Sequence, residues 1–187
     1  RKAKSGPIEQ GAVGAGKGMV CFDHKGGIGT ASRLVTVDQN TYTVGCLVLS
    51  NFGSRHLALF ADLSTDDADL ETPDGSIMII LGTDAPLYDR QLQRLAKRAA
   101  AGLGRTGSRI ENGSGDIVIA FSTKNTYPHH GKGTTESIET LRDDHDVMND
   151  LFQAVIESTE EAIINSMKYA ETTVGRKGRV IKKAPIE

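Results

Sequence analysis

One short segment, residues 77–81, constrains the fold more than any other, because its sequence, IMIIL, is apolar at every position. A strand with one face in water alternates apolar and polar residues, whereas a strand covered on both faces has no need to. We therefore predict a central strand that other layers cover on both sides. The run is also far shorter than the ~20 residues of a membrane span, so we expect no membrane partner.

Further strands are predicted on both sides of this segment in the sequence. Residues 33–37 and 42–49 have strand character, and residues 38–40 between them give the spacing of a hairpin. Residues 117–121 form another apolar run, which we predict to be a buried strand. Residues 25–32 are rich in glycine, and we predict a loop there.

Two long helices are also predicted. Leucines and alanines recur at helical spacing after Pro86, where a helix can begin, and we expect Gly102 and Gly104 to close this helix. A second apolar stripe runs from residue 147 to about residue 170. Because the strands come in runs between two helices, the pattern favours α+β layers over strict βαβ winding.

The length and charge of the chain exclude some classes of protein. Its 187 residues fit a single domain or a fragment of one, and 22 Lys and Arg against 24 Asp and Glu give a net charge of −2. A nucleic-acid-binding domain usually carries a basic excess, so we expect no nucleic-acid partner. Cys21 and Cys46 lie in apolar segments, and we predict buried thiols rather than a disulfide framework.

One glycine-rich segment resembles a phosphate-binding loop. Residues 11–17 match the first seven positions of the pattern G-x-x-x-x-G-K, but the eighth is Gly18, where a hydroxyl would be needed for Mg²⁺. No apolar strand precedes the segment and no helical pattern follows it, so bound phosphates would lack a helix N-terminus. We predict a glycine-lined pocket or turn, and no cofactor.

A second group of residues could suggest a metal site. It consists of His129, His130, His145 and Asp146. Their spacing fits no structural zinc pattern, and adjacent side chains in an extended loop point apart. We predict histidines of surface loops and no metal.

The step from Gly75 to Ser76 is the most informative one for function. Residues 62–75 form an acidic connector, with six acidic side chains among fourteen residues, and Ser76 begins the predicted central strand. If the backbone were cut between them, the Ser76 hydroxyl would lie beside its own α-amine. Such an amine has a pKa of about 7.7–8.0, so part of it is neutral at pH 7 and can accept the hydroxyl proton. The alternative is a serine that simply starts a strand after a turn.

Three further polar residues lie next to predicted strands. Ser114 and Asp116 precede the strand at residues 117–121, and their spacing of two projects both to the same side. The alternative for this pair is an ordinary Gly/Asn turn. Asn51 follows the strand at residues 42–49, where its amide either caps a turn or donates to a developing oxyanion.

Several segments together resemble one known family. Around the serine these are residues 74–80, 83–87, 90–96 and 102–107, and elsewhere residues 14–19, 25–33, 44–53, 113–123 and 161–172. Taken in chain order, they resemble the DmpA-type aminopeptidases, which include L-aminopeptidase/D-esterases, D-aminopeptidases and β-peptidyl aminopeptidases. The resemblance covers nearly the whole chain and corresponds to the C-terminal part of the family chain.

The resemblance implies a fold and a self-cleavage. The fold is a four-layer αββα sandwich of the DmpA/ornithine acetyltransferase type. The precursor cuts itself between Gly75 and Ser76, so that residues 1–75 end the α-subunit part and residues 76–187 form the β-subunit part.

The resemblance also implies a reaction. Ser76 is the nucleophile, Asn51 donates to the oxyanion, and Ser114 and Asp116 complete the constellation. The enzyme releases N-terminal residues from short peptides, amino-acid amides or esters through an acyl-enzyme, without a metal, and works as a homo-oligomer of processed α/β pairs.

Two alternatives and the cellular location stay open at this point. The same scaffold could serve as a catalytically inactive binding or assembly module. An ornithine acetyltransferase-like enzyme would use threonine as its nucleophile, so Ser76 counts against it. The chain begins without Met and without a signal-like segment, so we expect it to be a piece of a longer chain whose true N-terminus is not seen. We favour the cytoplasm and leave the periplasm open.

Overall fold

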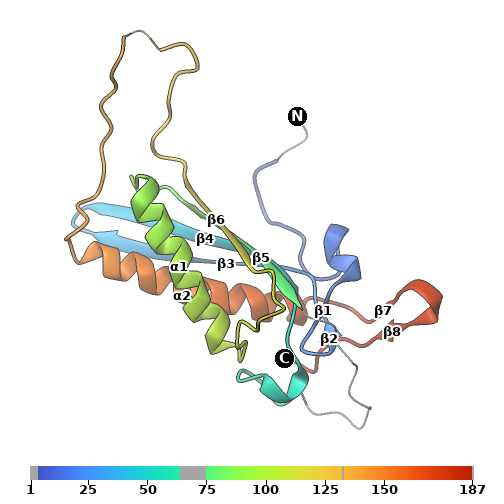
Figure 1. Ribbon diagram of the computed structural model, residues 1–187. Helices are drawn as coiled ribbons and strands as arrows, with labels where there is room; N and C mark the ends of the chain where they lie inside the picture. Colours follow the sequence, from blue (N-terminus) through green and yellow to red (C-terminus); the bar gives the residue numbers. More distant parts are fainter. Residues whose placement is uncertain (1–3, 64–74, 132, 187) are drawn as a thin grey trace.

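A computed structural model of the chain describes residues 4–63, 75–131 and 133–186 (Figure 1). Its main sheet has four strands, in the order β3 (Ile28–Val37), β4 (Asn40–Asn51), β5 (Ser76–Thr83) and β6 (Ile117–Ser122). The first three strands pair antiparallel, whereas β5 and β6 pair parallel. The parallel connection needs a crossover, which is supplied by α1 (Asp89–Arg105). The predicted α+β class is confirmed.

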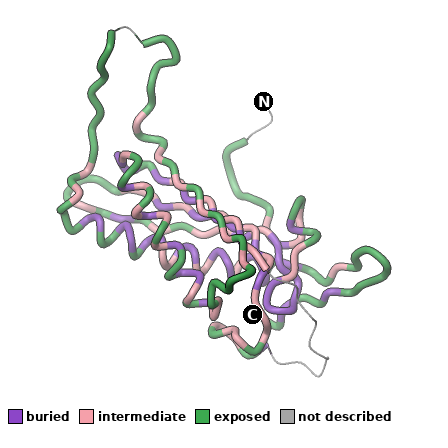
Figure 2. The backbone as a smooth tube through the Cα atoms, in the orientation of Figure 1, coloured by how far each residue is buried: buried purple, intermediate pink, exposed green. Residues whose placement is uncertain are grey.

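Both long helices cover the same face of the sheet. These helices, α1 and α2 (Val147–Lys168), pack against each other, with α2 against β3 and β4 and α1 against β6 (Figure 1). Buried and less buried residues alternate along β4 and β5, and Figure 2 shows burial by colour along the chain. The hydrophobic core therefore lies between one sheet and one helix layer.

Several short elements gather at one end of the sheet. They are η1 (Gly14–Gly18), β1 (Val20–Cys21), β2 (His24–Lys25), η2 (Arg55–Leu57), β7 (Thr173–Val174), η3 (Arg176–Gly178) and β8 (Val180–Ile181). Strands β7 and β8 form a hairpin that projects from this end of the molecule (Figure 1).

The hairpin predicted before the central strand is confirmed, but it is longer than expected. It joins β3 to β4 through a tight turn at Asp38, whose φ is 53°. Strand β3 begins at Ile28, so the loop predicted over residues 25–32 is wrong. The reason is α2: a Cβ at Gly29 would lie 1.9 Å from the carbonyl oxygen of Ala162. Glycine is needed at this position because helix α2 passes close to the strand. It does not mark a turn of the chain.

The two predicted helices are confirmed, with different ends for the first. Helix α1 begins at Asp89 rather than near Pro86, and it ends at Arg105, where the Thr106 hydroxyl donates to the Leu103 carbonyl at 2.7 Å. Gly102 and Gly104 lie within the helix and do not close it. At Gly102 an added Cβ would lie 2.5 Å from the Ile156 carbonyl oxygen, so this glycine lets α1 approach α2 closely.

The face of the sheet opposite the helices differs from the prediction. In β5, Ile77, Ile79 and Leu81 are buried against the helices, while the residues between them are partly exposed. In β6, which was predicted to be buried, Ile117, Ile119 and Phe121 are 46–51% exposed, because no described element covers this face. The described residues thus supply one sheet and one helix layer, which is half of a four-layer αββα arrangement.

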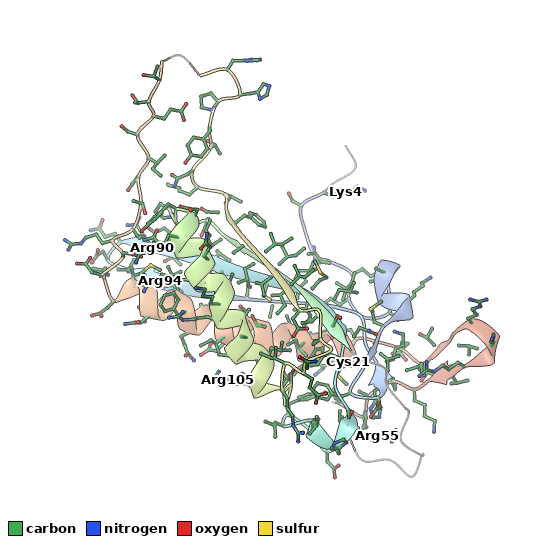
Figure 3. The ribbon with its side chains drawn as sticks, viewed as in Figure 1. Lys4, Cys21, Arg55, Arg90, Arg94 and Arg105 are labelled. Atoms are coloured by element: carbon green, nitrogen blue, oxygen red, sulfur yellow. The ribbon has the colours of Figure 1, made fainter. Side chains whose placement is uncertain are left out.

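Both cysteines are buried free thiols, as predicted. Figure 3 shows Cys21 among the side chains packed at the end of the sheet where β1 and β2 lie. Burial raises the pKa of each thiol to about 12, so neither is a thiolate at neutral pH. No helix in the described parts of the chain has the length and apolar character to span a membrane.

Candidate active site

The predicted nucleophile lies at the first position of β5. Ser76 pairs across the sheet with Asn51, the last residue of β4, so their side chains project from the same face. This is the face that α1 and α2 leave uncovered, because the next residue, Ile77, points into the helix-covered core. The register of two neighbouring strands therefore brings the predicted nucleophile and the predicted oxyanion donor together on the open side of the sheet.

The residue before Ser76 is held against the backbone of the neighbouring strand. A Cβ at Gly75 would lie 2.5 Å from the Cα of Phe52 and 2.6 Å from the carbonyl oxygen of Asn51. Only glycine fits at this distance. The remainder of the predicted acidic connector, residues 64–74, lies outside the described residues.

Ser114 and Asp116 reach the same place from the N-terminal side of β6. Asp116 Oδ1 accepts a hydrogen bond from the Ser114 hydroxyl at 2.6 Å and another from the backbone N–H of Ile77 at 3.2 Å. The spacing of two residues places both side chains on one side, as predicted. The bond to Ile77 fixes the carboxylate next to the start of β5.

One contributor to the site was not predicted from the sequence. The backbone N–H of Gly115 donates to Ser76 Oγ at 3.2 Å. A Cβ at this position would stand 3.3 Å from the same oxygen, so glycine keeps the approach to Ser76 open. A backbone donor leaves no side-chain signal, and the only hint was a glycine between two polar residues.

The carboxylate of Asp116 has spare hydrogen-bonding capacity. Its second oxygen, Oδ2, is buried and has no partner among the described residues. A buried polar atom without a partner is costly, and such atoms collect at functional sites. This oxygen can therefore accept a hydrogen bond from a group that is absent while the backbone is intact.

The first residue of β1, Val20, orients the Asn51 side chain. Its Oδ1 accepts a hydrogen bond from the backbone N–H of Val20 at 3.0 Å. This contact uses the carbonyl end of the side-chain amide and leaves the NH₂ end as a donor. Val20 is 31 residues away in the sequence, so its role in holding Asn51 could not be predicted from local patterns.

The other motifs of the sequence do not join this site. Residues 14–18 form the short helix η1, which follows no strand of the main sheet, and they do not build a phosphate-binding loop. His129 and His130 stack edge to face with 4.6 Å between ring centroids, and His145 Nδ1 accepts from the Val147 N–H at the start of α2. Within the described ranges, no three metal-ligating side chains gather.

The sequence of this chain matches that of a peptidase family. The model of Peptidase family S58 matches residues 1–181, so the chain belongs to this family. The chain is 42% identical over 203 aligned positions to "Beta-peptidyl aminopeptidase BapA" of Sphingosinicella microcystinivorans, an alignment that covers 98% of this chain and 51% of the relative.

Solved structures of two aminopeptidases have the same fold as this chain. The L-aminopeptidase D-Ala-esterase/amidase from Ochrobactrum anthropi superposes with a TM-score of 0.87 at 38% identity, over 98% of this chain and 51% of that one. It is described as a prototype for the serine aminopeptidases and a new variant among the Ntn hydrolase fold. A Burkholderia sp. beta-aminopeptidase gives a TM-score of 0.85 at 36% identity, over 97% and 52% of the two chains. The chain thus spans about half the length of these relatives.

Proposed function

We propose that this chain forms the catalytic part of a self-processing serine aminopeptidase whose nucleophile is Ser76. The observation that carries the proposal is the convergence of Asn51, Gly115 and Asp116 around Ser76, next to a glycine that tolerates no side chain. The similarity to serine aminopeptidases supports the same assignment.

The first step is cleavage of the bond between Gly75 and Ser76. The Ser76 hydroxyl attacks the carbonyl carbon of Gly75, the C–N bond breaks as the nitrogen gains a proton, and water hydrolyses the resulting ester. Gly75 leaves with a free carboxylate and Ser76 keeps a free α-amine. Close packing of Gly75 on Asn51 and Phe52 supports this step, because it holds the scissile carbonyl in one place.

The second step is turnover of a substrate. The α-amine of Ser76 accepts the proton of the Ser76 hydroxyl, which attacks the substrate carbonyl and forms an acyl-enzyme. The free NH₂ of Asn51 donates to the developing oxyanion, and the Gly115 N–H lies beside the attacking oxygen. Asp116 positions Ser114 and offers its unpartnered Oδ2 to the new amine.

The substrates we propose are short peptides, amino-acid amides and esters that release an N-terminal residue. The printed names of the relatives, a beta-peptidyl aminopeptidase and an L-aminopeptidase D-Ala-esterase/amidase, support this range. We also propose that processed α/β pairs assemble into a homo-oligomer, as the resemblance implies.

Replacement of the nucleophile tests the proposal. Ser76→Ala should abolish both the split, seen by intact-mass analysis, and hydrolysis of amino-acid p-nitroanilides. The matched control is Ser137→Ala, because Ser137 is exposed and lies far along the chain in a loop. The control should split and turn over like the wild type. A wild-type preparation that stays unsplit with full activity, or one that splits and never turns over, would contradict the proposal.

A further inference from the structure

A basic cavity lies at the end of the molecule where the short elements gather. It has a volume of about 520 Å³ and lies between η1, β1 and the β7–β8 hairpin. Its basic side chains are Lys17, Lys25, Arg176, Lys177 and Arg179, and no acidic side chain is among the described residues that line it. Ser76, Asn51, Ser114, Gly115 and Asp116 do not line the cavity, although Val20, whose backbone N–H donates to Asn51, does.

The four outer cations have no counter-ion in the described parts of the chain. Lys17, Arg176, Lys177 and Arg179 are exposed, and none of them forms an ion pair with a described residue. The nearest pair in sequence, between Glu171 and Lys183, lies outside the lining. Like charges held together repel one another, so this arrangement favours a bound anion.

The fifth cation, Lys25, forms part of the wall and is buried. Its side chain is 1% exposed, and its ammonium donates to the carbonyl oxygens of Gly16 at 2.8 Å, Gly26 at 2.7 Å and Met19. Burial lowers the pKa of Lys25 to about 8, and no described carboxylate forms an ion pair with it. The three carbonyl oxygens take all three donors of this ammonium, so Lys25 adds positive charge to the wall of the cavity rather than a hydrogen bond to a bound anion.

Backbone hydrogen bonds fix the walls that carry these charges. The Lys25 N–H donates to the Lys182 carbonyl at 2.7 Å and ties the hairpin to β2, and the Gly175 N–H closes the hairpin on the Arg179 carbonyl at 2.7 Å. On the opposite wall the Met19 N–H closes η1 on the Gly16 carbonyl at 3.1 Å. The basic groups thus stand on anchored segments, which lowers the entropic cost of binding.

From this geometry we propose that the cavity binds a small organic anion with two or three negative charges, either a polycarboxylate or a phosphate ester. Arginine guanidinium groups match the planar geometry of both anions, and the lysines add charge. The volume falls within the range of about 300–1,000 Å³ that is usual for small-molecule sites. Recognition here would use side-chain cations, unlike a phosphate-binding loop, which uses backbone N–H groups at a helix start.

Calorimetric titration of the protein with citrate and with pyrophosphate tests the proposal. At an ionic strength of about 10 mM, where screening is weak, we expect saturable binding of one anion per chain and much weaker binding of acetate. The tighter of the two probes assigns the ligand to the carboxylates or to the phosphates. The double variant Lys17→Gln/Lys177→Gln should weaken this binding by about tenfold.

The matched control removes two lysines elsewhere. Lys97 on α1 and Lys124 after β6 are both exposed and do not line the cavity, so Lys97→Gln/Lys124→Gln should keep the wild-type affinity. Ser76→Ala should also bind like the wild type, which separates this site from the proposed catalytic one. Lack of saturable binding, equal weakening in both double variants, or loss of binding in Ser76→Ala would each overturn the proposal.

Discussion

At the residue scale, close packing and burial restrict which residues two positions tolerate. Gly75 lies against the backbone of Asn51 and Phe52, and Lys25 holds three carbonyl oxygens with one buried ammonium. The sequence analysis marked Gly75 as the residue before the expected cleavage point, but nothing in it indicated that a side chain there would overlap the neighbouring backbone. Neither set of contacts could be predicted from local pattern, because most of the partners, such as Phe52 for Gly75 and Gly16 for Lys25, lie elsewhere in the chain.

Replacement of Gly75 tests the first contact. Gly75→Ala should slow cleavage before Ser76 and lower the free energy of unfolding by about 1–3 kcal/mol, because the new Cβ overlaps the neighbouring backbone. Mass analysis over time and denaturant unfolding measure the two effects. Gly18→Ala is the control, since a Cβ there meets nothing within 4 Å. If both variants cleave at the same rate and unfold with the same free energy, close packing at residue 75 affects neither cleavage nor stability, and this prediction is wrong.

The pH dependence of stability tests the burial of Lys25. Burial lowers its pKa from 10.5 to about 8, so between these values the unfolded state binds more protons than the folded state. The contribution of Lys25 to stability therefore rises as the pH rises through this window, and it is lowest below pH 8. We expect the stability of the wild type relative to Lys25→Met to increase from about pH 8 to 10.5 in denaturant unfolding. A constant difference would show that Lys25 titrates normally.

At the element scale, the sequence predicted what depends on local periodicity and missed what depends on contacts between elements. The β3–β4 hairpin and both long helices follow from apolar spacing and turn residues. Gly29 and Gly102 suggested a loop and a helix end, yet both lie where another helix passes within contact distance. A glycine has the same appearance in a sequence whether it allows a turn or a close approach.

Two glycines of α1 form a matched pair that tests this distinction. Gly102→Ala should destabilise the protein by about 1–3 kcal/mol, because the added Cβ meets the Ile156 carbonyl at 2.5 Å. Gly104→Ala meets nothing within 4 Å and should stabilise it by up to about 1 kcal/mol through helix propensity. Thermal or denaturant unfolding measures both. The same sign of change in both variants would contradict close packing of α1 on α2.

At the scale of the whole molecule, one face of the sheet carries the helices and the other carries the proposed chemistry. Ser76 and Asn51 share the uncovered face because strand register places them opposite each other. Local spacing suggested the pairing of Ser114 with Asp116, and the family resemblance brought these four residues together before any geometry was known. The Gly115 and Val20 contacts needed the fold, since backbone donors have no signature in a sequence.

N-terminal sequencing of a fully active preparation is the most direct measurement of the proposed chemistry. We expect a second terminus with the sequence SIMII, starting at Ser76, in an amount that matches the number of active sites found by titration with an acylating substrate analogue. Full activity in material whose main chain still runs unbroken from Gly75 into Ser76 would contradict the proposal, because the α-amine would then not exist.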